Sequence, residues 1–229
     1  MRAMSKVFLT FCLSMMTFLA VAQTSFGLRM GSTWSNVNTS EAIGNATPNF
    51  KNINGFSIGV FAEIPVAPQF SIQPEIGYTR KGFVVNEGFD TPLFGIDVPI
   101  GVTAETKFDY LEIPVLAKYS FGEEKLKAYV AVGPSIGYAL NGRVDTKTNL
   151  LVDINLGSNN INLQDQNFNR VEIGATGAAG VSYDAGFGTL FVDARYNRGF
   201  TEAYNLPFVD EKVKTSGFGL NMGFAVPIN

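Results

Sequence analysis

The sequence predicts an all-β fold, an eight-stranded antiparallel up-and-down transmembrane β-barrel preceded by a signal peptide. Three observations lead to this prediction. Apolar residues alternate with small or polar residues in eight separate segments, and the connections between these segments are alternately short and long. After residue 22, no apolar run approaches the ~20 residues that a membrane-spanning helix needs.

The first 22 residues have the three parts of a secretory signal peptide. Arg2 and Lys6 give a positive start, residues 7–21 are apolar, and Ala20-Val21-Ala22 provides a small-x-small cleavage site. We therefore predict cleavage before Gln23, with residues 23–229 as the barrel domain; an uncleaved membrane anchor is the alternative. The single cysteine, Cys12, lies inside the signal peptide, so a disulfide in the mature chain is excluded.

The first four predicted strands are residues 26–31, 56–64, 70–81 and 110–119. Every second position in them is apolar, which places these side chains on one face of a strand. In order, the apolar residues include Phe26, Leu28 and Met30; Phe56, Ile58 and Val60; Phe70, Ile72 and Ile76; and Leu111, Ile113 and Val115.

The last four predicted strands are residues 126–138, 170–183, 190–196 and 217–226. The same alternation continues in them, with many glycines on the second face. In order, the apolar residues include Leu126, Val130 and Ile136; Val171, Ile173 and Val181; Leu190 and Val192; and Phe218, Leu220 and Met222.

The predicted connections differ in length at the two ends of the barrel. Three are tight, around residues 65–69, 122–125 and 184–188, and four are long, around residues 35–54, 82–106, 141–167 and 198–213. Short turns at one end and long loops at the other are typical of outer-membrane barrels. Both ends of the chain then lie at the short-turn end, which faces the periplasm.

Alternation alone does not decide whether the apolar face points inward or outward, and a soluble lipocalin-like carrier also has eight antiparallel strands. The second face is rich in Gly, Ala and Ser, which suits the narrow interior of a small barrel. Tyrosines on the apolar face lie near strand ends, as in an aromatic girdle. They are Tyr78, Tyr138 and Tyr196 at the long-loop end, and Tyr119 and Tyr183 at the short-turn end.

Charged residues on the second face have both signs, which predicts a network of ion pairs in the barrel interior, because an unpaired buried charge is costly. The predicted network consists of Arg29, Glu63, Glu75, Lys81, Glu112, Lys118, Arg170, Glu172, Asp193 and Arg195. Together with the glycines and the tyrosines, this pattern favours a barrel whose apolar face contacts lipid.

Composition excludes several classes of function. The formal charge of −3 argues against a nucleic-acid partner. The chain contains no histidine, which excludes Ser/His/Asp and Cys/His catalysis and any histidine metal site. Glu63, Glu75 and Glu112 could act as paired catalytic carboxylates, but pairing with Lys118, Arg29 or Arg195 explains them better. We predict no catalytic, cofactor or metal site.

Several segments resemble the PorT-like outer-membrane barrels of the Bacteroidetes. They are residues 26–35 (FGLRMGSTWS), 59–82 (GVFAEIPVAPQFSIQPEIGYTRKG), 110–119 (YLEIPVLAKY), 171–183 (VEIGATGAAGVSY) and 193–199 (DARYNRG). The resemblance implies an outer-membrane barrel in a Gram-negative cell envelope and covers nearly all of the mature chain.

The leading functional hypothesis is a non-enzymatic scaffold in the outer membrane. Lipid surrounds its wall, and its long loops contact a protein or a surface ligand, with residues 83–85 and 92–100 as the expected contact points. A small channel and a soluble periplasmic carrier are the alternatives.

Overall fold

The computed structural model describes residues 24–38, 49–93, 96–149, 153–161, 163, 169–201 and 214–228. The predicted signal peptide lies outside these residues, as do parts of the long connections. The described part of the chain contains no helix long and apolar enough to cross a membrane.

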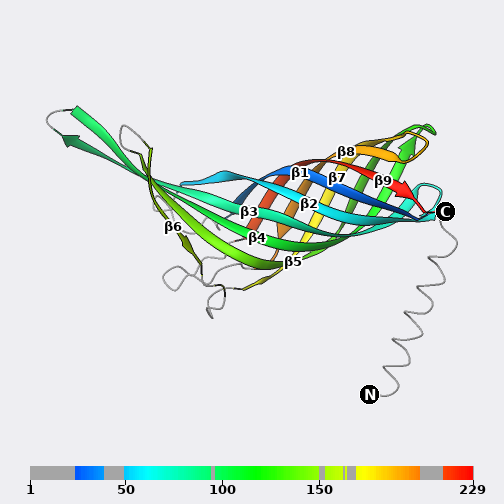
Figure 1. The fold of residues 1–229 in the computed structure, drawn as a ribbon, viewed down its shortest axis with the longest axis horizontal. Coiled ribbons are helices and arrows are strands. Elements are labelled where there is room, and N and C mark those ends of the chain that lie inside the picture. Colours follow the sequence, from blue (N-terminus) through cyan, green and yellow to red (C-terminus); the bar gives the residue numbers. More distant parts are fainter. Residues whose placement is uncertain are drawn as a thin grey trace, which may run out of the picture.

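The described residues form nine antiparallel strands (Figure 1). They are β1 (Ser25–Asn38), β2 (Asn49–Ala67), β3 (Phe70–Leu93), β4 (Ile96–Gly122), β5 (Leu126–Asn149), β6 (Asp153–Asn160), β7 (Val171–Asp184), β8 (Thr189–Gly199) and β9 (Lys214–Pro227). Their order in the sheet is β4-β3-β2-β1-β9-β8-β7-β5-β6, and β4 also pairs with β5. That pairing closes eight strands into a barrel and leaves β6 outside it.

The predicted eight-stranded barrel is confirmed, and each predicted segment coincides with a barrel strand. The three tight connections are also correct, because β2 and β3, β4 and β5, and β7 and β8 are joined by only a few residues. Gly122 and Gly186, at two of these turns, have φ of 125° and 86°, a backbone region in which glycine is favoured.

The predicted long connection over residues 82–106 is wrong, because most of it is strand. β3 and β4 continue as a paired ribbon from Gly82↔Lys107 to Leu93↔Ile96, and β5 and β6 add two more strands to it. This sheet, which we call the extension, projects from the barrel at the end away from the C-terminus (Figure 1). A ribbon outside the membrane has no lipid-facing side and therefore needs no apolar alternation, which is why the sequence pattern did not reveal it.

Side-chain exposure decides the orientation of the barrel wall. Phe56, Ile113 and Leu220 are 46%, 45% and 52% exposed on the outer surface, whereas Glu112 and Arg195 are only 8% and 4% exposed inside. β8, the shortest barrel strand, has 11 residues, and about 9–11 tilted residues cross a bilayer. The apolar face therefore points outward, as the transmembrane interpretation requires.

Candidate functional site

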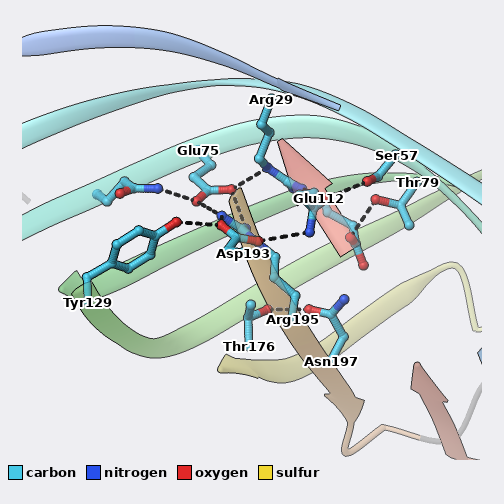
Figure 2. Close-up of polar contacts among 12 residues, drawn as sticks. Arg29, Ser57, Glu75, Thr79, Glu112, Tyr129, Thr176, Asp193, Arg195 and Asn197 are labelled. Carbon is cyan, nitrogen blue, oxygen red and sulfur yellow. Dashed lines mark hydrogen bonds and ion pairs between the residues drawn. The ribbon is translucent and has the colours of Figure 1, made fainter. Parts of the chain in front are cut away.

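The centre of the lumen contains a group of charged side chains from β1, β3 and β8 (Figure 2). Nη1 and Nη2 of Arg195 lie 2.8 and 2.9 Å from the two carboxylate oxygens of Glu75, a bidentate pair. Nε of Arg29 lies 2.8 Å from the same carboxylate. All three side chains are buried. Glu75 therefore links β3 to β1 and β8 through ion pairs that water screens little.

Asp193 extends this central group toward β5 and β9. Its carboxylate accepts hydrogen bonds from the Tyr129 hydroxyl at 2.9 Å, from the Asn221 amide at 3.0 Å and from Nε of Arg195 at 3.2 Å. The Asn221 carbonyl oxygen in turn accepts from Ser57 at 3.0 Å. Six strands are thus joined through one network of polar side chains.

A second group lies nearer the extension and is built around Lys81 of β3. Its ammonium group contacts Glu112 of β4, and it lies 2.8 Å from Glu172 of β7. Thr79 donates to Glu112 at 2.8 Å, and the Tyr110 ring centre lies 5.2 Å from the Lys81 ammonium. Two carboxylates therefore share one buried cation.

A third pair lies at the short-turn end. Nζ of Lys118 is 2.7 Å from Glu63, which also accepts a hydrogen bond from Ser71 at 3.0 Å. Lys118 stands over the Tyr129 ring, 4.3 Å from its centre. A cavity of about 190 Å³ opens beside this pair at the mouth of the barrel.

Arg170 is not part of any of these groups, contrary to its predicted place in the network. It lies just before β7 and donates two hydrogen bonds to the Ala139 carbonyl, at 3.0 and 3.1 Å. Its guanidinium carbon lies 4.7 Å from the centre of the Tyr138 ring, which is on the outer face. At the mouth of the barrel the side chain can leave the lumen and stack outside. No carboxylate of the described residues lies within ion-pairing distance of it.

Two aromatic clusters lie in the lumen, one on either side of the charged centre. Toward the short turns, Phe61, Tyr129 and Phe191 pack with Ala225, and the Phe61 and Phe191 rings meet edge to face at 5.5 Å. Toward the extension, Phe108, Tyr110 and Ala139 pack with Leu163. Inside the lumen beside Phe61 and Phe191, a cavity of about 10 Å³ is left, which is room for about one water at most.

Glycines make room for the cluster near the short turns. A Cβ atom on Gly27 would lie 2.2 Å from the Phe61 ring, and one on Gly223 would lie 2.3 Å from the Phe191 ring. The alternation placed Phe61 and Phe191 on the inner face, but their role as plugs was missed. The available signal was a large aromatic residue on a face otherwise made of small residues.

The geometry does not bring the three candidate catalytic carboxylates together as a free pair. Glu63, Glu75 and Glu112 belong to three different groups, and each contacts a cation of its own. Within the described part of the chain, no group of three potential metal ligands occurs.

Residues 21–205 match the protein family described as "Outer membrane protein beta-barrel domain". The chain belongs to this family. It is therefore an integral protein of the outer membrane, surrounded by lipid at its apolar wall. No curated protein gives a significant match to the sequence.

Several solved structures are similar to this outer-membrane barrel. Neisserial surface protein A has a TM-score of 0.48 and 18% identity over 89% of this chain and 97% of that one. OprG from Pseudomonas aeruginosa has a TM-score of 0.45 and 11% identity over 90% and 98%. Ail of Yersinia pestis, solved with the heparin analogue sucrose octasulfate, has a TM-score of 0.38 and 15% identity over 88% of this chain and 98% of that one.

The five predicted girdle tyrosines of this outer-membrane barrel all lie on the outer wall. Tyr138, Tyr183 and Tyr196 are 42%, 48% and 48% exposed. Tyr78 packs against Phe56 with ring centres 5.2 Å apart, and Tyr119 packs against Phe70 at 4.8 Å. Amphipathic rings at such positions suit the boundary between acyl chains and headgroups.

Proposed function

We propose that this outer-membrane barrel is a non-enzymatic scaffold, closed to solutes, that holds a β-sheet extension outside the cell. The observation that carries the proposal is the filling of its lumen. A charged centre, paired throughout, lies between two aromatic clusters, and an eight-stranded barrel has little interior beyond its own side chains. We infer that the lumen ion pairs and the tyrosine girdle serve stability and placement in the membrane.

The same filling argues against the small-channel alternative. Ions would have to pass Phe61 and Phe191 at one end and Phe108 and Tyr110 at the other. We expect refolded protein in a planar lipid bilayer to give no stable single-channel openings. Reproducible openings of uniform conductance would overturn the closed-barrel proposal.

A catalytic role has no support in the residues. The chain has no histidine, and its lumen carboxylates are engaged with Arg29, Arg195, Lys81 or Lys118. A carboxylate that is fixed by a buried cation is poorly placed to exchange protons with a substrate.

The extension is the proposed contact surface for a partner in the envelope or at the cell surface. From Gly82 to Leu93, β3 runs 12 residues beyond the barrel, about 40 Å of extended chain. Residues 83–85 and 92–100 were the expected contact points; the side chains of 92–100 lie outside the described residues. Photo-crosslinking from residue 83, with a probe at exposed Val130 as the control, tests whether a partner is captured only by the extension.

Within the family, we propose that the chain is one of the PorT-like barrels, on the strength of motifs such as YLEIPVLAKY at residues 110–119. We also propose that residues 1–22 are removed on export. Intact mass of the protein from isolated outer membranes would test this, with Gln23 as the expected first residue; a mass that includes residues 1–22 would contradict it.

A further inference from the structure

The charged side chains that the structure describes differ between the two rims of the barrel. At the long-loop end, the described charged side chains on the outer face are seven cations and three carboxylates. The cations are Arg80, Lys107, Arg143, Lys147, Arg170, Arg198 and Lys214, and the carboxylates are Glu105, Asp109 and Asp145. At the short-turn end, the exposed charged side chains are Lys125 and Lys127 against Glu123, Glu124 and Asp184. Among the described side chains, cations therefore outnumber carboxylates at the outer rim.

Two of the rim arginines are fixed on the aromatic residues that mark the membrane boundary. The guanidinium of Arg170 lies over Tyr138, with its Nε and Nη2 bonded to the Ala139 carbonyl. These contacts use two of its three nitrogens. Arg80 lies 5.5 Å from the centre of the Phe56 ring and donates to the Tyr78 hydroxyl at 3.0 Å. Asp109 neutralises Arg80 at 2.8 Å, whereas Arg170 has no such partner among the described residues.

Arg198 adds a third cation at this level. It follows the girdle residue Tyr196 by two positions on β8, so both side chains point outward, and it is exposed. No described carboxylate pairs with it. Arg170 and Arg198 are thus two arginines next to girdle tyrosines, and neither has a carboxylate partner among the described residues.

We propose that this arginine rim, centred on Arg170 and Arg198, binds the phosphate groups of lipids in the outer leaflet. The guanidinium group matches phosphate oxygens with paired donors, and it does so best where water is partly excluded. Stacking on Tyr138 holds one such group at the depth where headgroups lie. The inference rests on the outer-membrane orientation, with the long loops outside, and not on the closed lumen.

The test compares two lipids that differ only in phosphate. Refolded full-length protein is mixed in detergent with dioleoyl phosphatidic acid or with dioleoylglycerol, and bound lipid is counted by native mass spectrometry. We expect the wild type to retain more phosphatidic acid than dioleoylglycerol. The Arg170→Gln/Arg198→Gln variant should retain at least about threefold less phosphatidic acid than the wild type. Lys125→Gln/Lys127→Gln, at the opposite rim, is the matched control and should retain the wild-type level.

Three outcomes would overturn the proposal. They are equal retention of the two lipids, an equal loss in the control variant, and full competition by inorganic phosphate at the concentration of the lipid. The last would show that the phosphate alone, and not a membrane lipid, is bound. Faster migration of unheated protein on a gel checks that each variant folds. If the double variant does not fold, the single variant Arg198→Gln, at an exposed residue, is tested in its place. Channel openings in a bilayer would end the closed-scaffold proposal and leave this one standing.

Discussion

The lumen and the extension use the same kind of interaction in opposite surroundings. In the lumen, Glu75 is fully buried between Arg29 and Arg195. On the extension, Lys107 lies 2.8 Å from both Glu105 and Asp145, with side chains about a fifth exposed. Buried pairs are costly to break because the remaining charge stays desolvated, whereas exposed pairs are replaced by water. Ion pairs of the same length, 2.8 Å, are therefore expected to contribute more to stability in the lumen than on the extension.

The largest expected effect is at Glu75. Glu75→Gln leaves Arg29 without its carboxylate partner and leaves Arg195 with Asp193 alone, which we expect to destabilise the barrel by about 3–5 kcal/mol. Urea unfolding in lipid vesicles, followed by Trp34 fluorescence, measures this. A loss below about 1 kcal/mol, as expected for an exposed pair, would show that ion pairs in the lumen contribute no more to stability than those on the extension.

The aromatic plug near the short turns gives the next effect. Phe61→Ala removes a buried ring that packs on Phe191 and Gly27, and we expect a loss of about 3–4 kcal/mol. The same unfolding experiment applies. Phe121→Ala, at an exposed residue of the outer wall, is the control and should cost clearly less.

A charge on the outer wall tests the orientation itself. Ile113→Arg puts a cation on the lipid-facing side of β4, and we expect a loss of about 2–4 kcal/mol near the bilayer midplane. Val66→Arg, exposed at a short turn, should cost about 0–1 kcal/mol. If both substitutions were tolerated equally, Ile113 would not face hydrocarbon.

The smallest effect is expected on the extension, and it depends on pH. Hydrogen bonds from Lys107 and Lys147 lower the pKa of Glu105, and those from Lys107 and Ser158 lower the pKa of Asp145. A lowered pKa means that these carboxylates stabilise the extension above the ordinary carboxyl range and lose that contribution as pH falls through their folded pKa.

Hydrogen exchange measures this effect. As the pH is lowered from neutrality through the folded pKa of these carboxylates, amides of the β4–β5 ribbon should exchange faster than the intrinsic rate change accounts for, because the carboxylates become protonated. Glu105→Gln should show a smaller dependence, with a cost at neutral pH below about 1 kcal/mol. Barrel amides of β7 and β8 provide the internal reference. Equal changes in both regions would contradict a local effect.

The barrel was predictable because lipid on one side and a narrow lumen on the other impose strict alternation, as in Phe56, Ile58 and Val60 of β2. Outside the membrane this constraint disappears, and the strands from Gly82 to Thr106 were not recognised. Arg170 was misplaced because parity fixes a side chain only within a strand, and this residue precedes β7. The alternation placed Phe61 and Phe191 on the inner face, but it could not show that the two rings meet, because that contact joins strands far apart in the sequence.

The way β5 changes neighbours links the two regions mechanically. β5 pairs with β7 from Leu126 to Tyr138 and with β6 from Arg143 to Asn149. Leu163, which follows β6 in the sequence, packs against Phe108 and Tyr110 at this end of the barrel. The aromatic cluster at that end is therefore connected, through Leu163, to β6, the edge strand of the extension. A force that separates β6 from β5 would therefore also pull on Leu163 and on the aromatic cluster that contains it.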